Sequence, residues 1–146
     1  MTTVTLSEFA DKMDEIMPVI MKEFLRHQMR EFYKTRLTMP QFVVMTILER
    51  NGESKMTDLA RFINVTTAAT TGLIDRLVRD GYAQRMHDPK DRRIIKAALT
   101  AKGQKTVRTM LEKRRQLTMK IFGMVSQKER EEYLKILMHI RDHLKE

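Results

Sequence analysis

A change of hydrophobic period near the middle of the chain restricts its fold more than any other feature. Before residue 80 most apolar side chains recur at spacings of three and four, which is the pattern of amphipathic helices. Between residues 82 and 99 the period becomes two, and Ile95, Ala97 and Leu99 alternate with their neighbours. After residue 100 the helical spacing returns. The sequence therefore predicts a mainly α-helical domain interrupted by one small β-hairpin.

Capping motifs indicate where several of the helices begin. A hydroxyl residue followed three positions later by Glu or Gln can form a capping box, which satisfies amide groups at a helix start. The three such boxes are Thr5 with Glu8, Thr38 with Gln41 and Ser126 with Glu129. The expected helices are 6–36, 38 to about 50, 58–64 after a Thr57 cap, 67–80, 100 to about 125, and a last helix beginning after Ser126.

The expected strands, 82–86 and 94–99, enclose a charged loop at residues 87–93 that begins His-Asp-Pro, a good start for a type I turn. Two helices joined by a tight connection come directly before this hairpin. A helix, a tight turn, a second helix and a basic hairpin are typical of a winged helix-turn-helix. We expect this fold over 38–99, with the helix-turn-helix at about 57–80 and the wing at 82–99.

Positive charge is concentrated in the same part of the chain. The sequence has 28 Lys plus Arg and 19 Asp plus Glu, a formal net charge of +9. Residues 76–120 alone hold 14 basic and four acidic side chains, so the remainder is almost neutral. Charge that served only solubility would be dispersed. The concentration indicates an anionic partner, with nucleic acid ahead of an acidic membrane.

Several classes of protein are disfavoured by what the sequence lacks. It contains no Cys, which excludes disulfides, thiolate metal sites and Cys nucleophiles. No apolar run is long enough to span a bilayer, and the N-terminal residues carry acids where a signal peptide needs apolar residues. We therefore expect a cytoplasmic protein without a membrane partner. We also expect neither an enzyme nor a cofactor, because no phosphate-binding Gly loop, HExxH motif or evident acid pair is present.

Small polar residues at the start of the 67–80 helix suit contact with DNA. Thr is a mediocre helix former, so four Thr within residues 66–71 need a reason beyond an ordinary capped helix start. Their hydroxyls can bond phosphates or base edges, and an Arg-rich hairpin tip can enter a minor groove. For Arg85 and Lys96, contact with phosphate and its absence are equally open. The expected DNA-contacting residues are Thr66, Thr67, Ala68, Thr70, Thr71 and Arg76 on the helix and Arg85, Lys90, Asp91, Arg92, Arg93 and Lys96 on the wing.

Three blocks, LIDRLVRDGY at 73–82, DPKDRR at 88–93 and LTAKG at 99–103, occur in the order and spacing of a known family. The chain resembles the multiple antibiotic resistance regulator (MarR) family of bacterial and archaeal transcription factors. The resemblance extends over almost the whole chain. It implies a homodimer that binds a pseudo-palindromic operator in double-stranded DNA, with dimerisation helices at 6–36 and 100–146.

The resemblance also implies roles for individual residues. Arg93 corresponds to the wing-tip arginine of the minor groove, Asp91 to the acid that holds it, and Arg92 to a phosphate contact. Arg76 is similar to the recognition-helix arginine, which lies near the DNA backbone or pairs with Asp75. Gly72 departs from the family, many of whose members carry a larger polar or basic residue there.

Members of this family often bind small aromatic or phenolic anions in a crevice between their DNA-binding and dimerisation parts. Residues that could line such a crevice are Met17, Met21, Phe24, Met45 and Met110, although Met also fills gaps in ordinary cores. His139 and His143 are four residues apart and could meet on one helix face. Without a third ligand they are better explained as a polar helix edge, so we expect no metal site.

Together these features predict a single domain over residues 1–146 that regulates transcription. It would bind DNA sequence-specifically as a homodimer, most often as a repressor in this family, and a small-molecule effector would release it. Two alternatives stay open. One is a basic architectural protein that binds DNA without sequence preference, and the other is a protein-interaction module that reuses the winged fold.

Overall fold

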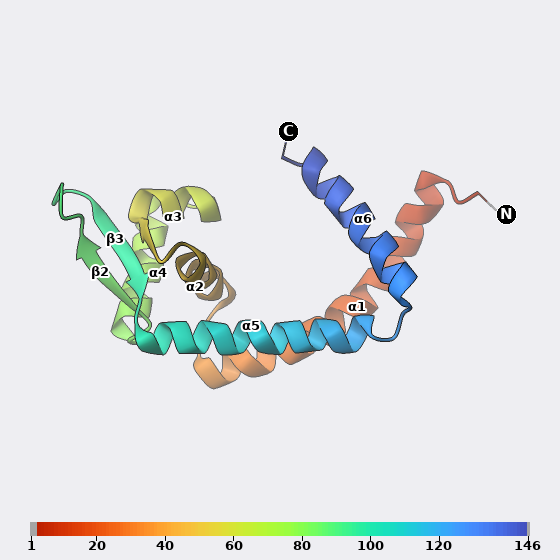
Figure 1. The fold of residues 1–146 in the computed structure, drawn as a ribbon, viewed down its shortest axis with the longest axis horizontal. Helices are drawn as coiled ribbons and strands as arrows, with labels where there is room; N and C mark the ends of the chain where they lie inside the picture. Colours follow the sequence, from red (N-terminus) through yellow and green to blue (C-terminus); the bar gives the residue numbers. More distant parts are fainter. Residues whose placement is uncertain (1–2, 146) are drawn as a thin grey trace. The chain divides into compact units, whose positions relative to one another are not determined.

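The computed structural model describes residues 3–145, which form a mainly helical fold with one small antiparallel sheet (Figure 1). The chain divides into two compact units, and the break falls between Leu111 and Glu112. The elements are α1 (Leu6–Thr35), α2 (Met39–Asn51), β1 (Glu53–Lys55), α3 (Met56–Ile63), α4 (Thr67–Arg79), β2 (Ala83–His87), β3 (Ile95–Leu99), α5 (Ala101–Phe122) and α6 (Gln127–His143). The predicted mainly α fold with a winged helix-turn-helix is confirmed.

All three predicted capping boxes are present in the structure and begin α1, α2 and α6. In each, the hydroxyl of the capping residue accepts from the backbone N–H three positions on, and the Glu or Gln side chain accepts from the cap's own N–H. The two bonds satisfy amides that the helix itself leaves without partners. Local sequence therefore fixes the start of these helices.

The structure corrects two predicted helix boundaries. α3 begins at Met56 after Lys55, with no side-chain capping bond, so the predicted Thr57 cap is wrong. The reason is that β1 ends at Lys55 and leads directly into α3. α5 ends at Phe122 rather than near Val125. Gly123 follows it, a residue that costs about 1 kcal/mol in a helix interior, and Ser126 then caps the start of α6.

The sheet has three strands in the order β1-β3-β2, and both pairs are antiparallel. The predicted hairpin is β2 and β3, paired from Ala83 with Leu99 to His87 with Ile95. β1 was not predicted, because three residues show no periodicity of their own. It pairs with the other edge of β3, where Ser54 lies opposite Ala97. β3 is therefore the central strand, and its Ala97 is completely buried.

The hydrophobic core of the first unit surrounds α2. Its Val44 and Met45 are completely buried, and its ring of Phe42 makes an edge contact with Phe32 of α1, with centroids 5.9 Å apart. Ile74 and Leu77 of α4 belong to the same core. The residues of α2 are apolar on most faces of the helix, and this central position explains why.

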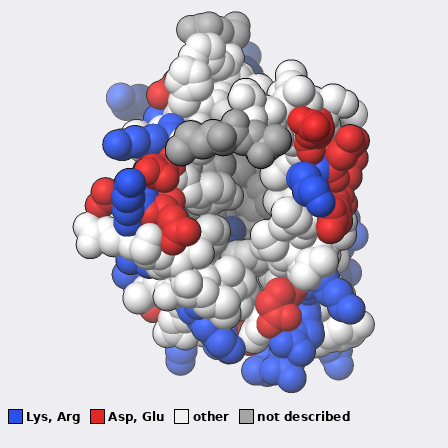
Figure 2. Space-filling model, turned by 90° about the vertical axis from the view of Figure 1, so that its right-hand side faces the viewer, with Lys and Arg blue, Asp and Glu red and all other residues white. Residues whose placement is uncertain are grey.

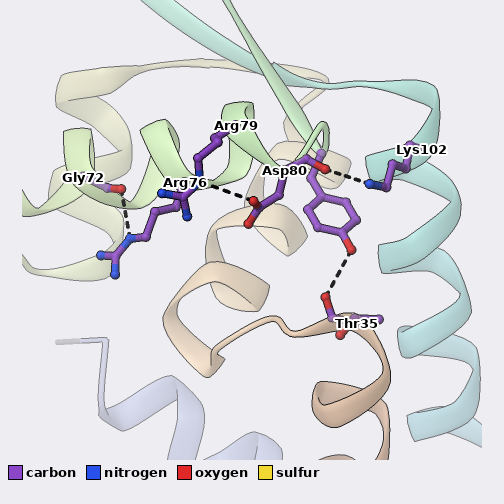
Figure 3. Close-up of polar contacts among 7 residues, drawn as sticks. Thr35, Gly72, Arg76, Arg79, Asp80 and Lys102 are labelled. Carbon is purple, nitrogen blue, oxygen red and sulfur yellow. Dashed lines mark hydrogen bonds and ion pairs between the residues drawn. The ribbon is translucent and has the colours of Figure 1, made fainter.

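A polar junction joins the end of α1, the turn after α4 and the start of α5. The Tyr82 hydroxyl donates to the Thr35 carbonyl oxygen at 3.2 Å, and Lys102 Nζ donates to the Asp80 carbonyl oxygen at 2.7 Å (Figure 3). Gly103 allows the close approach, because a Cβ at this position would lie 2.0 Å from the Tyr82 carbonyl oxygen. The junction fixes the C-terminal end of α4 against the two long helices.

Both long terminal segments leave large apolar side chains in solvent. On α1, Phe9 and Ile16 are 53% and 48% exposed, and on α6 Leu134 and Ile136 are 56% and 57% exposed. Figure 2 shows one face of the molecule, on which uncharged residues, polar and apolar, lie between acidic and basic groups. Large apolar side chains left in solvent in such numbers are typical of a surface that another protein covers. Within residues 3–145 no helix is both long and apolar enough to cross a membrane.

Candidate nucleic-acid interface

The start of α4 presents a short, open surface of small residues. Thr66 caps the helix, and its hydroxyl accepts from the Ala69 amide at 3.1 Å. Thr66, Thr67 and Ala68 are exposed, as the sequence analysis expected of residues that contact DNA. The first amides of a helix carry partial positive charge and favour an anion. This end of α4 can therefore receive a phosphate or a base edge.

Thr70 does not belong to that surface. Its side chain is completely buried, and its hydroxyl donates to the Thr66 carbonyl oxygen at 3.1 Å. It lies on the same side of α4 as Leu73, Ile74 and Leu77, which pack into the core. The expectation that Thr70 contacts DNA is therefore corrected, because the helical spacing turns it inward.

Arg76 and Arg79 lie on the outer face of α4 (Figure 3). Arg76 Nε donates to the carbonyl oxygen of Gly72 one turn earlier, at 3.2 Å. Arg79 Nε lies 3.4 Å from Asp80 Oδ1. The alternative in which Arg76 pairs with Asp75 is not seen, because Asp75 is engaged by a side chain from the wing. Arg76 is exposed, and its guanidinium lies beside Gly72, in the middle of α4.

Arg85 connects the wing to α4. From β2, its Nη2 reaches Asp75 Oδ1 at 2.5 Å and the Thr71 carbonyl oxygen at 3.5 Å. The carboxylate compensates the charge of the guanidinium and holds it against the helix. Arg85 therefore links β2 to α4, whatever else it contacts.

Lys96 is held by two carboxylates. Its Nζ lies 2.8 Å from Glu53 Oε1 on β1 and 2.9 Å from Asp88 Oδ2 in the wing loop. The hydrogen bond from Lys96 is the main reason that the pKa of Asp88 is lowered, and the bonds to Glu53 and then Asp88 raise the pKa of Lys96. The sequence did not indicate Glu53, because β1 was not predicted. Only 18% of the Lys96 side chain is exposed, so little of it remains for another anion.

Side-chain to backbone bonds organise the wing loop. Asp88 Oδ1 accepts from the amides of Lys90 and Asp91 at 2.8 and 3.3 Å, and Asp91 Oδ1 accepts from the Arg93 amide at 3.0 Å. Arg93 Nε lies 3.9 Å from Asp91 Oδ1, yet the Arg93 side chain is 95% exposed. Lys90 and Arg92 are exposed as well. The loop is therefore shaped by its acids and presents its basic side chains to solvent.

The helix start and the wing face a common hollow of about 410 Å³. Three of its lining residues are cationic and three are threonines, and only part of this set was expected from the sequence. The lining residues are Lys55, Met56, Thr57, Thr67, Thr71, Arg85, Arg93, Ile94 and Ile95. Lys55 and Thr57 were missed, because they flank a helix start that the strand β1 determines. The hollow combines positive charge with hydroxyl groups, which suits an anionic ligand.

The residues proposed to line a ligand crevice are not grouped together. Met45 and Met110 belong to the buried core, whereas Met17 and Met21 are exposed on α1 and Phe24 is half-buried. None of the five lines the hollow described above.

His139 and His143 do meet on α6. Their ring centroids are 4.4 Å apart, and His143 Nδ1 lies 2.9 Å from the His139 carbonyl oxygen. Within residues 3–145, no group of three potential metal-binding side chains comes together.

Comparison with known proteins gives consistent matches. Residues 37–95 match the model of the MarR family. The uncharacterized HTH-type transcriptional regulator YfiV of Bacillus subtilis (strain 168) is 36% identical over 83 residues, which cover 57% of this chain and only about half, 52%, of that relative. The HTH-type transcriptional repressor YetL of the same strain is 28% identical over 123 residues, covering 82% and 74%. The crystal structure of a MepR-like protein complexed with pseudoligands is 31% identical, covers 92% and 94%, and superimposes with a TM-score of 0.59.

Proposed function

This chain belongs to the MarR family of transcriptional regulators, and from that premise we propose that it represses transcription by binding a pseudo-palindromic operator as a cytoplasmic homodimer. The name of the related repressor YetL supports the repressor role. The observation that carries the proposal is the shared hollow between the start of α4 and the wing. Thr67 and Thr71 line it from the helix and Arg93 from the wing, so one duplex could meet both elements at once.

We assign different tasks to the residues around the hollow. Thr66, Thr67 and Thr71 meet base edges or phosphates in the major groove, and Arg76 lies along the backbone. Arg92 binds phosphate, and the almost fully exposed Arg93 enters the minor groove.

Asp75 pairs with Arg85, and Glu53 and Asp88 pair with Lys96, so these two residues align the wing. The exposed cations of the loop, which include Lys90, contact phosphate directly.

The exposed apolar faces of α1 and α6 support a dimer, because contact with a second copy of the chain would remove these apolar side chains from water. Two copies would place two α4 helices at half-sites about 10 base pairs apart, as pseudo-palindromic operators require. A small aromatic or phenolic effector that bound beside Met17, Met21 and Phe24 would change the spacing of those helices and release DNA. The flexible Met side chains can adapt to such a ligand.

The test begins with a random duplex library from which the purified protein retains fragments, which are then sequenced. Affinity for a recovered fragment is compared with affinity for a scrambled one over a range of salt concentrations. We expect a steep decline with salt, and replacement of Arg92 by Ala should reduce the slope by about 0.9 for the lost phosphate contact. Lys12→Ala on α1, where Lys12 is exposed and pairs with Glu15, is the control and should leave the slope unchanged.

Three outcomes separate the candidate functions. A recovered motif with a clear preference over scrambled DNA supports the repressor. Equal affinity for both sequences would instead favour an architectural protein. No binding to any duplex by the purified dimer would favour a protein-interaction module and refute the proposal.

A further inference from the structure

The two arginines of the wing tip occupy the centre of a tight turn. The Ile94 amide donates to the Asp91 carbonyl oxygen at 3.0 Å, which closes the turn around Arg92 and Arg93. The peptide between the two arginines is oriented by a side chain outside the turn. His87, the last residue of β2, has its Nδ1 2.9 Å from the Arg92 carbonyl oxygen.

We propose that His87 is a positioning residue that fixes the Arg92–Arg93 peptide and so aims both arginines at DNA. The inference rests on the proposed function, because it assumes that the wing binds a duplex. His87 has no task in the proposed function itself.

The hydrogen bond determines which ring nitrogen carries the proton. A carbonyl oxygen can only accept, so His87 Nδ1 must be the donor. In the neutral imidazole Nε2 is then unprotonated. This tautomer is a property that can be measured in the free protein, before any DNA is added.

The acidic side chains of the loop bond to backbone amides, whereas the Arg92 carbonyl oxygen is bonded to His87. Asp88 holds the amides of Lys90 and Asp91, in the first half of the loop, and Asp91 holds the Arg93 amide. The side chain of Asp88 is itself anchored by Lys96. A loop held in its binding conformation loses less conformational entropy when a ligand binds. Loss of the His87 bond should therefore weaken DNA binding without removing any side chain that touches DNA.

This role can be tested by substitutions of His87 that place a hydrogen-bond donor at different distances from the backbone. The amide nitrogen of Asn is attached to Cγ, as Nδ1 is in His, so His87→Asn should keep the bond to Arg92. The amide nitrogen of Gln lies one bond farther out, so His87→Gln should lose it, and His87→Leu has no donor. We expect His87→Asn to bind the selected duplex as the wild type does, and the other two to bind about 3- to 10-fold more weakly, the range of one hydrogen bond.

Two further measurements distinguish positioning from a general structural effect. Nitrogen NMR of the imidazole in the free wild-type protein should show the Nδ1-protonated tautomer. In an Arg92→Ala, Arg93→Ala background, His87→Leu should have little further effect on affinity, because it acts through those arginines.

The inference is overturned if His87→Leu binds the selected duplex as tightly as the wild type, or if the ring carries its proton on Nε2. Neither result speaks against DNA binding by the wild type, so the proposed function stands. Failure of the wild type to bind any duplex would refute the proposed function and this inference together.

Discussion

Gly103 offers a sharp test of how the ends of α4 and α5 are joined. A Cβ added here would lie 2.0 Å from the Tyr82 carbonyl oxygen and 2.9 Å from its carbon, whereas real Cβ atoms essentially never approach within 3.0 Å. The obstacle is backbone, and the same oxygen accepts the Thr100 amide at 3.0 Å. Replacement of Gly103 by Ala must therefore push α5 away from the turn after α4.

The size of the effect follows from two opposing terms. Overpacking a tight site costs about 1–3 kcal/mol, and a backbone neighbour that cannot rotate away favours the upper end. Ala gains up to about 1 kcal/mol over Gly in a helix. The net loss for Gly103→Ala is therefore about 2 kcal/mol, which corresponds to a decrease in Tm of about 4–8 °C for a chain of this size.

Gly72 in α4 provides the matched control, because a Cβ there would meet nothing within 4 Å and its φ is not positive. Gly72→Ala should therefore raise the Tm, by about 2–4 °C, through helix propensity alone. Both variants are compared with the wild type by thermal unfolding at one protein concentration. A Gly103→Ala variant with a Tm equal to or above that of the wild type would refute the close-approach argument.

Three further changes test other parts of the fold. Tyr82→Phe removes the hydroxyl that donates to Thr35 and should cost about 1 kcal/mol in denaturant unfolding; an unchanged midpoint would mean that the bond adds nothing. Because the folded-state pKa of Asp88 is lowered from 3.8, its stabilising effect is complete above that pH and is lost as the pH falls through the lowered pKa. Acid titration of unfolding should therefore show a larger loss below pH 3.8 in the wild type than in Lys96→Met, and identical titrations would argue against the ion pair. Thr38→Ala removes the cap of α2 and should cost about 1 kcal/mol, which a far-UV circular dichroism melt would detect; a melt identical to that of the wild type would contradict the capping role.

The parts of the fold that sequence predicted are those with local causes. The capping boxes at Thr5, Thr38 and Ser126 involve residues three apart, and all three are formed. β1 has no such local signal. Its three residues form a strand only because β3, more than forty residues later, offers an unpaired edge. The start of α3 was misplaced for the same reason, since β1 sets it.

The candidate site was predictable in type but not in detail. Thr-rich and Arg-rich segments indicated where an anion would bind, and the hollow between α4 and the wing contains Thr67, Thr71 and Arg93 from those segments. Composition could not show that Thr70 faces the core, because exposed and buried positions occur side by side within a single helical turn. Nor could it indicate Lys55, which reaches the hollow through the unpredicted strand.

The number of basic residues overestimates the positive charge that is available to bind DNA. Arg85 and Lys96 both lie in the most basic segment, yet each is bonded to carboxylates, and two of those, Asp75 and Glu53, lie outside that segment. A phosphate would have to compete with these carboxylates for either cation. Arg93 differs, because its nearest carboxylate is 3.9 Å away and its side chain remains exposed. The wing therefore uses some cations to hold its shape and leaves others to bind, and this division follows from tertiary pairing rather than from the number of charges.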